Sequence, residues 1–211
     1  MISVNVGRGK DADWAGRLRR TAIDKRPAAG HVAVGRLGIA GDEQVDTADH
    51  GGYDQAVYAY AREDLDWWVE QLGRELRDGT FGENITTAGL DVTGALIGEI
   101  WQIGTARVQV TAPRIPCVVF AGWLGEEHWV KRFAAARRPG AYLRVLREGV
   151  VGAGDVAQVL ARPDERVTIA ESMEAFYGDP AAMRRLLRVE GRGLRWDEFA
   201  AGVLGRAAAG P

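Results

Sequence analysis

The stretch ALIGEIWQIGTARVQVTAPRIPC, residues 95–117, decides how this chain folds. Apolar and polar side chains alternate on both sides of Gly104-Thr105, as around Val108 and Val110, and a period of two is typical of β-strands. A glycine between two such runs favours a tight turn. The stretch therefore predicts a β-hairpin whose second strand leads into two prolines and a cysteine.

The only cysteine of the chain, Cys117, stands at this predicted strand exit. Pro113 and Pro116 fix the backbone around it, and functional residues often sit on loops that a rigid scaffold carries. Arg114 would favour the thiolate, which is the form that acts as a nucleophile or a metal ligand. A free cysteine is, however, usually a small buried hydrophobe without reactivity. The residues by themselves favour this second interpretation and leave the first open.

Strands and helices are predicted on both sides of the hairpin. Short strands separated by glycines cover residues 1–60, and closing strands cover residues 141–161. Apolar residues at helical spacing predict a helix from about Arg62 to Arg77. A second helix is predicted over residues 126–138, where Pro139-Gly140 would end it.

From Arg162 onward the composition changes to three helix-like segments, in which Asp179-Pro180 forms a cap and first-turn pair. A strand-rich part followed by a run of helices predicts an α+β fold that is mainly β. We expect a β-barrel-like domain with a few peripheral helices over residues 1–160. A small three-helix domain with its tail would follow over residues 161–211.

Length, charge and composition exclude several classes of protein. A chain of 211 residues fits one domain with a small appendage, and 46% hydrophobic residues are enough for a sizeable core. The formal net charge of -2 argues against direct nucleic-acid binding through a basic field. No apolar run reaches the roughly 18 residues of a membrane span, and the first residues lack the features of a secretory signal. A lone cysteine forms no internal disulfide, so we expect a cytoplasmic protein without membrane contact.

Motifs of several common site classes are missing. His31, His50 and His128 lie far apart and no Cys-x-x-Cys pair exists, so a structural zinc site has little support. The sequence contains neither a G-x-S-x-G elbow nor an H-E-x-x-H motif, which argues against two large groups of hydrolases.

Two glycine-containing motifs offer candidate site residues. In DHGGYD, residues 49–54, His50 precedes Gly51-Gly52, whose backbone N–H groups either approach an anion or simply form a tight turn. The turn is the favoured interpretation of this motif. In TFGENITTAGLD, residues 80–91, Asn84 either caps a turn or donates to a ligand carbonyl, and the residues alone do not separate these alternatives.

The order of the motifs along the chain is more specific than any one of them. GD, HGG, FGEN and PR-x-P-C follow one another between Ile2 and Leu160, and this ordered set resembles the MOSC family, named after the C-terminal domain of molybdenum cofactor sulfurase. The helical C-terminal part resembles the three-helix domain that follows MOSC in bacterial proteins linked to resistance against N-hydroxylated base analogues, such as hydroxylaminopurine. The resemblance implies a β-rich, barrel-like fold with a cleft.

The resemblance also implies a functional cysteine. By position Cys117 is the key cysteine of the family, which either ligates molybdenum or carries sulfur as a persulfide, and Arg114 is the arginine of the same motif. Relatives that reduce N-hydroxylated compounds hold the molybdenum cofactor, Mo-molybdopterin, and take electrons from separate redox proteins. Residue type alone favours an inert, buried cysteine, whereas the resemblance favours a functional Cys117.

Further candidates follow from the cofactor's phosphate, which needs cations and backbone donors, and from the expected cleft. His50 would shuttle a proton during N–O reduction. For Lys25 and Arg36 a solvated surface cation is an equally good interpretation. The candidate cofactor-binding residues are Lys25, Arg36, Gly51, Gly52, Glu83, Asn84 and Arg114.

The chain departs from the family pattern at two places beside the expected cleft. Tyr53 stands after HGG where the family commonly has proline, and Tyr60-Ala61 replaces the common Tyr-Pro before the first helix. These departures affect the expected shape of the substrate and the expected start of the first helix more than the expected fold. No flavin, iron–sulfur or haem motif is visible, so electrons would come from another protein.

Three functions remain in competition. The leading one is a reductase of hydroxylaminopurines or similar N-hydroxylated small molecules, with Cys117 as the metal ligand and a separate electron-donor protein. The second is a sulfur carrier whose Cys117 accepts a persulfide from a cysteine desulfurase. The third is a non-catalytic module that binds an anionic ligand and uses the arginines between Arg184 and Arg195 to contact a partner, although a solvated helix face usually explains such a cluster.

Overall fold

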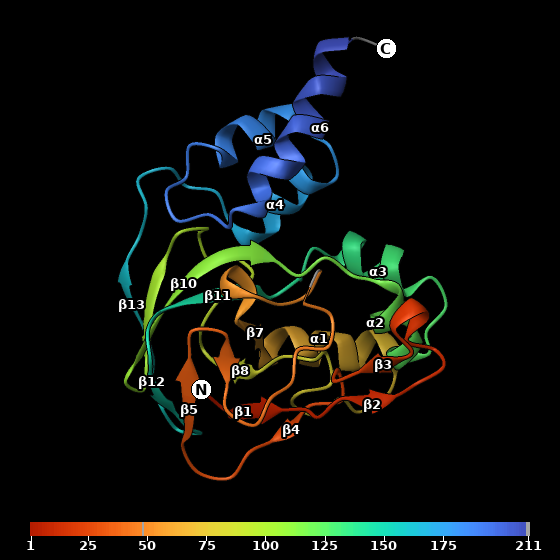
Figure 1. The fold of residues 1–211 in the computed structure, drawn as a ribbon, viewed down its shortest axis with the longest axis vertical. Helices are drawn as coiled ribbons and strands as arrows, with labels where there is room; N and C mark the ends of the chain where they lie inside the picture. Colours follow the sequence, from red (N-terminus) through yellow and green to blue (C-terminus); the bar gives the residue numbers. More distant parts are fainter. Residues whose placement is uncertain (48, 210–211) are drawn as a thin grey trace.

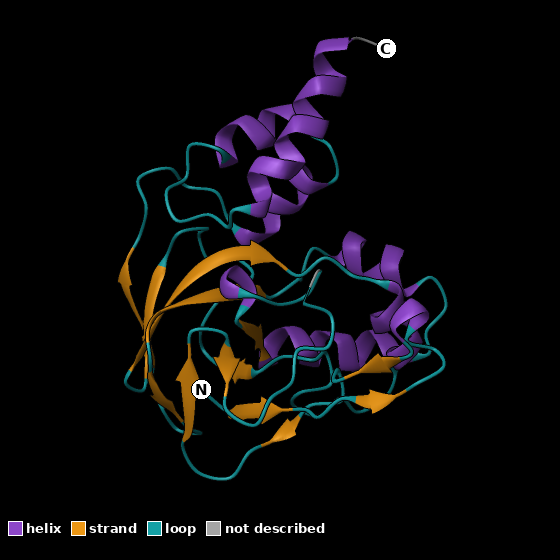
Figure 2. Ribbon diagram, viewed as in Figure 1, coloured by secondary structure: helices purple, strands orange, loops and turns teal. Residues whose placement is uncertain are grey.

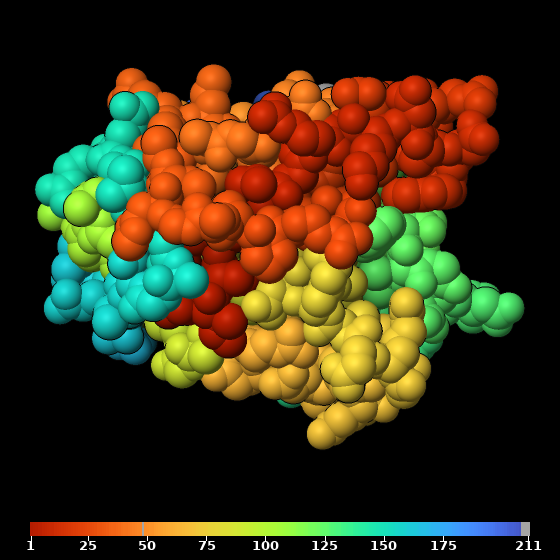
Figure 3. All heavy atoms as spheres, turned by 90° about the horizontal axis from the view of Figure 1, so that it is seen from below, coloured from red at the N-terminus to blue at the C-terminus, as the bar shows by residue number. Residues whose placement is uncertain are grey.

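The computed structural model describes residues 1–47 and 49–209. A strand-rich body carries three C-terminal helices on one side, and further helices lie along the body (Figures 1 and 2). Seen from below, the surface is formed by the N-terminal segment in red and orange, next to the segment around α1 in yellow and the α2–α3 region in green (Figure 3). No helix of the described residues has the length and apolar character to cross a membrane.

The bounds of the elements are as follows. The strands are β1 (Ser3–Val6), β2 (Lys10–Asp11), β3 (Arg20–Thr21), β4 (Arg26–Pro27), β5 (Val32–Gly35), β6 (Gly38–Ile39), β7 (Val57–Ala61), β8 (Ile85–Thr87), β9 (Ile100–Ile103), β10 (Ala106–Pro113), β11 (Ala141–Arg147), β12 (Gly149–Val151) and β13 (Ala157–Ala161). The helices are α1 (Arg62–Leu72), α2 (Val118–Leu124), α3 (Trp129–Ala136), α4 (Ile169–Phe176), α5 (Pro180–Leu186) and α6 (Arg195–Ala209), with single 3-10 turns at Gly16–Leu18 and Tyr53–Gln55.

Most strands belong to one large sheet. Its order is β13-β9-β10-β11-β7-β8-β1-β4, beside a three-stranded sheet β12-β5-β6 and the pair β2-β3. Neighbouring strands are antiparallel except β7 and β8, which run parallel. The helix α1 and the loop after it supply the crossover connection that a parallel pair requires. The fold is therefore mixed α+β, as expected.

The predicted hairpin is confirmed as β9 and β10. Ile103 pairs with Ala106 across the turn in antiparallel register. Gly104 adopts a positive φ of 53° there, which suits a residue without a Cβ atom. The predicted closing strands are also found, as β11, β12 and β13.

A bulge in β10 directs the chain toward the candidate site. The register between β10 and β11 shifts between Val110 and Ala112, just before the strand ends at Pro113. An extra residue of this kind bends a strand and increases its twist. The segment that carries Cys117 therefore leaves the sheet at a bend, and Cys117 follows a strand exit, as predicted.

The expected barrel-like domain is present as a large sheet that does not close into a barrel within the described residues. Its end strands, β4 and β13, share no ladder of hydrogen bonds among residues 1–47 and 49–209. β4 has only two residues, and one of them, Pro27, has no N–H group to donate. Met1 spans the gap instead: its amino group donates to the carbonyl of Asp155 (2.8 Å), and its carbonyl accepts from the N–H of Gly154 (3.2 Å).

The helices that precede the tail differ in length from the prediction. α1 begins at Arg62 as expected but ends at Leu72, because Gly73 adopts the left-handed conformation (φ 64°) that ends a helix. The helix predicted over residues 126–138 is the shorter α3. The helix α2, which begins directly after Cys117, was not predicted.

These helices pack through an aromatic cluster. Trp68 of α1, Phe120 of α2, and Trp129 and Phe133 of α3 surround Phe81 in the loop before β8. Ring centroids lie 4.6 Å apart for Trp68 and Trp129 and 5.1 Å apart for Phe120 and Phe133. Aromatic rings at such distances contribute more than their buried area alone. The cluster holds α2, and with it the residue that precedes α2, against the body.

The three predicted tail helices are present as α4, α5 and α6. Thr168 and Glu171 form a capping box at the start of α4, and Asp179 caps α5 before Pro180. Ile169, Leu186 and Trp196, with other apolar tail residues, belong to the same buried cluster as the inner side chains of the large sheet. The tail therefore shares a core with the strands.

Replacing Phe133 tests the aromatic cluster. The Phe133→Ala variant should lose about 3–5 kcal/mol of unfolding free energy, because it removes a fully buried ring and leaves a cavity. Val130→Ala, on the exposed side of the same helix, should cost less than about 1 kcal/mol. Urea unfolding followed by tryptophan fluorescence measures both, and equal losses would contradict this description of α3.

Candidate functional site

Two adjacent chambers open beside the end of β10. The outer chamber has a volume of about 650 Å³, and the inner chamber a volume of about 90 Å³. Cys117, His50, Gln55 and Tyr142 line both chambers. The outer chamber lies between the body and the tail, since Phe176 of α4 and residues of α6 complete its wall.

Cys117 lies where the two chambers meet. It is the N-cap residue of α2 in an extended conformation (φ −131°), and it is half-buried. The strand before it ends at Pro113, and its own carbonyl accepts from the N–H of Ala121 (3.0 Å) at the start of the helix. Its backbone is therefore held on both sides while its side chain contributes to the chamber wall.

Arg114 brings a buried positive charge to the inner chamber. Arg114 is 6% exposed. Its guanidinium lies 5.2 Å from the ring centre of Tyr58 and 4.9 Å from that of Phe120. Nη1 donates to the hydroxyl of Tyr142 (2.9 Å). Burial alone lowers the pKa of Arg114, but the neighbouring Tyr142, Tyr58 and Cys117 groups raise it, so the side chain stays charged.

This charge has no carboxylate partner in the described part of the chain. None of the ion pairs among residues 1–47 and 49–209 includes Arg114, and its Nε atom is buried without a hydrogen-bond partner. A buried charge is costly unless it is paired and hydrogen-bonded. The arrangement therefore favours an anion in the chamber, whether a thiolate or part of a ligand.

Lys25 and Asn84 line the inner chamber around a buried carboxylate. The ammonium of Lys25 forms an ion pair with Asp42, and the side chains of both are almost fully buried. Asp42 also accepts from the side-chain amide of Asn84 (2.9 Å) and from the N–H of Gly7 (2.8 Å). Burial lowers the pKa of Lys25, against the effect of Asp42. These groups hold one another and present a polar wall.

His50 lies on the wall of both chambers, with Nδ1 3.1 Å from the hydroxyl oxygen of Tyr142. Burial, and next the positive charge of Arg114, lower the pKa of His50 to about 3. The imidazole is therefore neutral at pH 7. This protonation state favours a hydrogen-bonding role over the proton shuttle expected from the sequence.

Glu83 does not reach either chamber. It is fully buried, and its carboxylate accepts from the N–H groups of Gly79 (2.5 Å) and Phe81 (2.9 Å) and from the hydroxyl of Thr86 (3.1 Å). Burial raises the pKa of Glu83 to about 7, although these hydrogen bonds act in the opposite direction. The structure thus gives Glu83 a part in shaping the loop before β8, away from any ligand.

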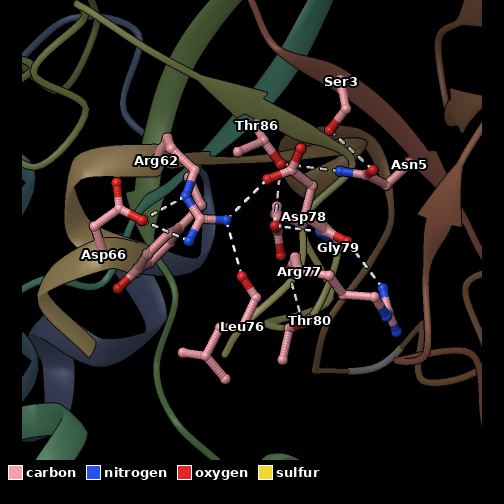
Figure 4. A network of polar contacts seen from close by, with 12 residues as sticks. Ser3, Asn5, Arg62, Asp66, Leu76, Arg77, Asp78, Gly79, Thr80 and Thr86 are labelled. Carbon is pink, nitrogen blue, oxygen red and sulfur yellow. Dashed lines mark hydrogen bonds and ion pairs between the residues drawn. The ribbon is translucent and has the colours of Figure 1, made fainter. Parts of the chain in front are cut away.

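Arg62 holds the same loop from the other side. Figure 4 shows its guanidinium between Asp66 of its own helix and the loop residues Leu76 and Asp78. It donates to the carbonyl of Leu76 (2.9 Å) and to the carboxylate of Asp78 (3.1 Å). The FGEN motif therefore forms a rigid loop whose asparagine, and not its glutamate, faces the inner chamber.

Arg36 and the diglycine also lie outside the chamber walls. Arg36 is exposed, with its guanidinium 5.8 Å from the ring centre of Tyr53. The N–H of Gly52 donates to the side chain of Gln44 (3.0 Å), and a Cβ atom on Gly51 would lie 2.6 Å from the same side chain. The glycines thus allow the close approach of Gln44, and the N–H of Gly52 is used within the protein.

Several wall residues were missed by the sequence analysis. Tyr142 lies in a predicted closing strand and was given no role, and no local pattern marked Gln55, whose Oε1 atom is buried without a partner among the described residues. Trp196 and Phe199 of α6 line the outer chamber because the tail docks there, which a linear pattern does not reveal. Among the described residues no group of three or more His, Cys, Asp or Glu side chains is placed to hold a metal ion.

Comparisons with known proteins agree on one family. The family model of the MOSC domain matches residues 46–158. The chain is 34% identical over 189 residues to the uncharacterized protein YflK of Bacillus subtilis, which covers 90% of this chain and 86% of YflK. It is 31% identical over 167 residues to a protein of Gibberella moniliformis named reductase, covering 77% of this chain but 29% of that protein.

A solved structure extends the likeness to the tail. The crystal structure of YiiM from Geobacillus stearothermophilus superposes with a TM-score of 0.81 at 32% identity. The superposition covers 96% of this chain and 97% of YiiM, so the tail helices have counterparts there.

Breaking the buried Lys25–Asp42 pair should destabilise the fold. The Asp42→Asn variant leaves a buried ammonium without its counter-charge, and we expect a loss of about 3 kcal/mol of unfolding free energy. Asp13→Asn, which removes an exposed carboxylate paired with Arg19, should change it by less than about 1 kcal/mol. Chemical unfolding of the two variants measures the contrast, and a small loss for Asp42→Asn would show that the pair contributes little.

The depressed pKa of His50 predicts how stability depends on pH. Between pH 7 and pH 5 the unfolded chain takes up a proton at His50 that the folded chain does not, so stability falls as the pH falls. The stability advantage of the wild type over His50→Gln should shrink by up to about 2 kcal/mol over this interval. Unfolding titrations at several pH values test this, with the exposed His31→Gln as the control. A difference that stays constant with pH would be the contrary result.

Proposed function

The chain belongs to the MOSC domain family, and from this premise we propose that it is a molybdenum-dependent reductase of N-hydroxylated small molecules. One observation carries the proposal: a half-buried thiol at the junction of two chambers lies beside a buried guanidinium that no carboxylate of the described residues pairs with. A thiolate is a soft metal ligand, and a phosphate-bearing cofactor is an anion that such a guanidinium favours.

The chambers fit a cofactor of this chemistry. The outer chamber falls within the range of about 300–1,000 Å³ that ligand pockets occupy. Arg114 Nε and Gln55 Oε1 are a donor and an acceptor that lack partners in the described part of the chain. Such buried groups are normally satisfied, so a ligand with complementary polar atoms accounts for both.

Each chamber residue has a place in this proposal. Cys117 would hold the metal, Arg114 and Lys25 would face the anionic part of the cofactor, and Gln55 and Asn84 would meet its polar atoms. The bound cofactor supplies two-electron chemistry at the N–O bond. The overall reaction is R–NHOH + 2e⁻ + 2H⁺ → R–NH₂ + H₂O, with the electrons delivered by a separate redox protein. The reductase from Gibberella moniliformis supports this choice of reaction by its name alone.

The tail would complete the substrate site. Phe176, Trp196 and Phe199 give the outer chamber an aromatic wall, which suits a flat ring system such as a hydroxylaminopurine and excludes water. In this proposal residues 1–160 form the cofactor domain, and residues 161–211 form a second domain that closes the outer chamber.

Sulfur transfer is a second candidate that rests on the same thiol. A persulfide on Cys117, received from a cysteine desulfurase, would be an anion that Arg114 stabilises. The large outer chamber favours the reductase, because a sulfur carrier has no need of a cavity of this size. Loss of metal binding together with a mass gain of one sulfur at Cys117 would favour the carrier.

Molybdenum content tests the proposal directly. Protein produced with ample cofactor should contain close to one molybdenum atom per chain by elemental analysis, and Cys117→Ser should lose most of it because the hydroxyl is a poor ligand for a soft site. Arg114→Gln should lower the occupancy about tenfold or more, since it removes the buried charge. The control Arg36→Gln removes a cation that lies outside the chambers, and it should leave the metal content unchanged.

The loaded wild type should also reduce a hydroxylaminopurine when supplied with a chemical electron donor. Absence of molybdenum from the wild type, with a molybdenum-binding relative loaded in the same cells, would reject the proposal.

A further inference from the structure

Tyr142 connects Arg114 and His50, which belong to two separate motifs of the sequence. Its hydroxyl oxygen lies 2.9 Å from Nη1 of Arg114 and 3.1 Å from Nδ1 of His50. The three side chains come from the segment after β10, from β11 and from the loop before β7, and all three residues line the inner chamber.

The direction of the hydrogen bond from Arg114 is fixed by chemistry. An arginine side chain has only donors, so the Tyr142 oxygen accepts from Arg114. The hydroxyl carries a single hydrogen, and His50 is its remaining side-chain neighbour within hydrogen-bond distance among the described residues. Within the described part of the protein this hydrogen is used only when it points to Nδ1 of His50, which then accepts it.

An accepting Nδ1 determines the tautomer of the ring. A neutral imidazole carries one N–H, so the proton is on Nε2 when Nδ1 is an acceptor. Burial and the nearby Arg114 and Arg195 charges oppose a second proton, and only Asp49 favours it. Nε2 has no hydrogen-bond partner within the described residues, and the ring lines both chambers beside Cys117.

We propose that Tyr142 is a positioning residue that holds His50 as the neutral Nε2–H tautomer, so that this N–H donates a hydrogen bond to the oxygen of the substrate's N–O group. The assignment to that oxygen rests on the proposed function, whereas the tautomer does not. A fixed N–H donor polarises the N–O bond and orients the substrate without giving up its own proton. Preorganised donors of this kind need no rearrangement during the reaction.

The wild-type protein without cofactor provides the first test. Nitrogen-15 NMR of the imidazole rings distinguishes a protonated from an unprotonated ring nitrogen, and loss of one signal set in His50→Gln separates His50 from His31 and His128. At pH 7 we expect His50 to show an unprotonated Nδ1 and a protonated Nε2, in favour of this tautomer by about tenfold or more. A protonated Nδ1, or a doubly protonated ring, would overturn the proposal.

A matched pair of variants tests the part played by Tyr142. Tyr142→Phe removes the donor to Nδ1 but keeps the ring, so the His50 signals should move toward a mixture of tautomers. The exposed Tyr53→Phe should leave them unchanged. An unchanged tautomer in a folded Tyr142→Phe would show that another group fixes it. If Tyr142→Phe does not fold, the wild-type spectrum decides the question alone.

Kinetics of the loaded enzyme separate this inference from the proposed function. Tyr142→Phe should lower kcat by about tenfold or more with KM nearly unchanged, because the donor acts on the reacting N–O group. If the protein shows the expected tautomer but holds no molybdenum, the positioning of His50 by Tyr142 stands. Only the role of His50 toward an N-hydroxylated substrate is then rejected. An unchanged kcat despite mixed tautomers would reject the role of the Nε2–H donor.

Discussion

A buried guanidinium that has no carboxylate partner within residues 1–47 and 49–209 is the constraint around which the candidate site is organised. Arg114 is held by the faces of Tyr58 and Phe120 and by the hydroxyl of Tyr142. These three residues come from β7, α2 and β11, so the arginine connects the centre of the sheet with the helix that begins after Cys117. Such contacts offset only part of the cost of burying a charge. The remainder favours an anion beside Arg114.

The same charge sets the state of its neighbours. It fixes the Tyr142 oxygen as an acceptor and disfavours the imidazolium form of His50. Arg114 also places a positive charge near Cys117. One residue therefore influences the chemical state of two others, Tyr142 and His50, and this gives the arginine of the PR-x-P-C motif a physical role.

Local patterns in the sequence predicted the parts of the fold that local interactions determine. The β9–β10 hairpin and the tail helices follow from alternation, turn residues and caps. α2 was missed because the apolar segment after Cys117 is too short to show a period, and its helix depends on contacts of Phe120 with distant rings. The open sheet was missed because strand pairing at the edges depends on tertiary contacts such as those of Met1 with the turn before β13.

The candidate site was predicted in part. Cys117, Arg114, His50, Lys25 and Asn84 all line the chambers, as their motifs suggested. Arg36, Gly51, Gly52 and Glu83 do not, because their loops direct them to other partners, which a motif does not specify. Tyr142 and the aromatic residues of α6 became visible only when the fold brought distant segments together.

X-ray absorption at the molybdenum edge tests the central claim most directly, because it counts the sulfur atoms around the metal. If Cys117 is a ligand, the wild type will show one more molybdenum–sulfur contact than a Cys117→Ser sample that retains enough metal to measure. An equal number of sulfur ligands in both samples would contradict the account and leave Cys117 as a residue beside the metal.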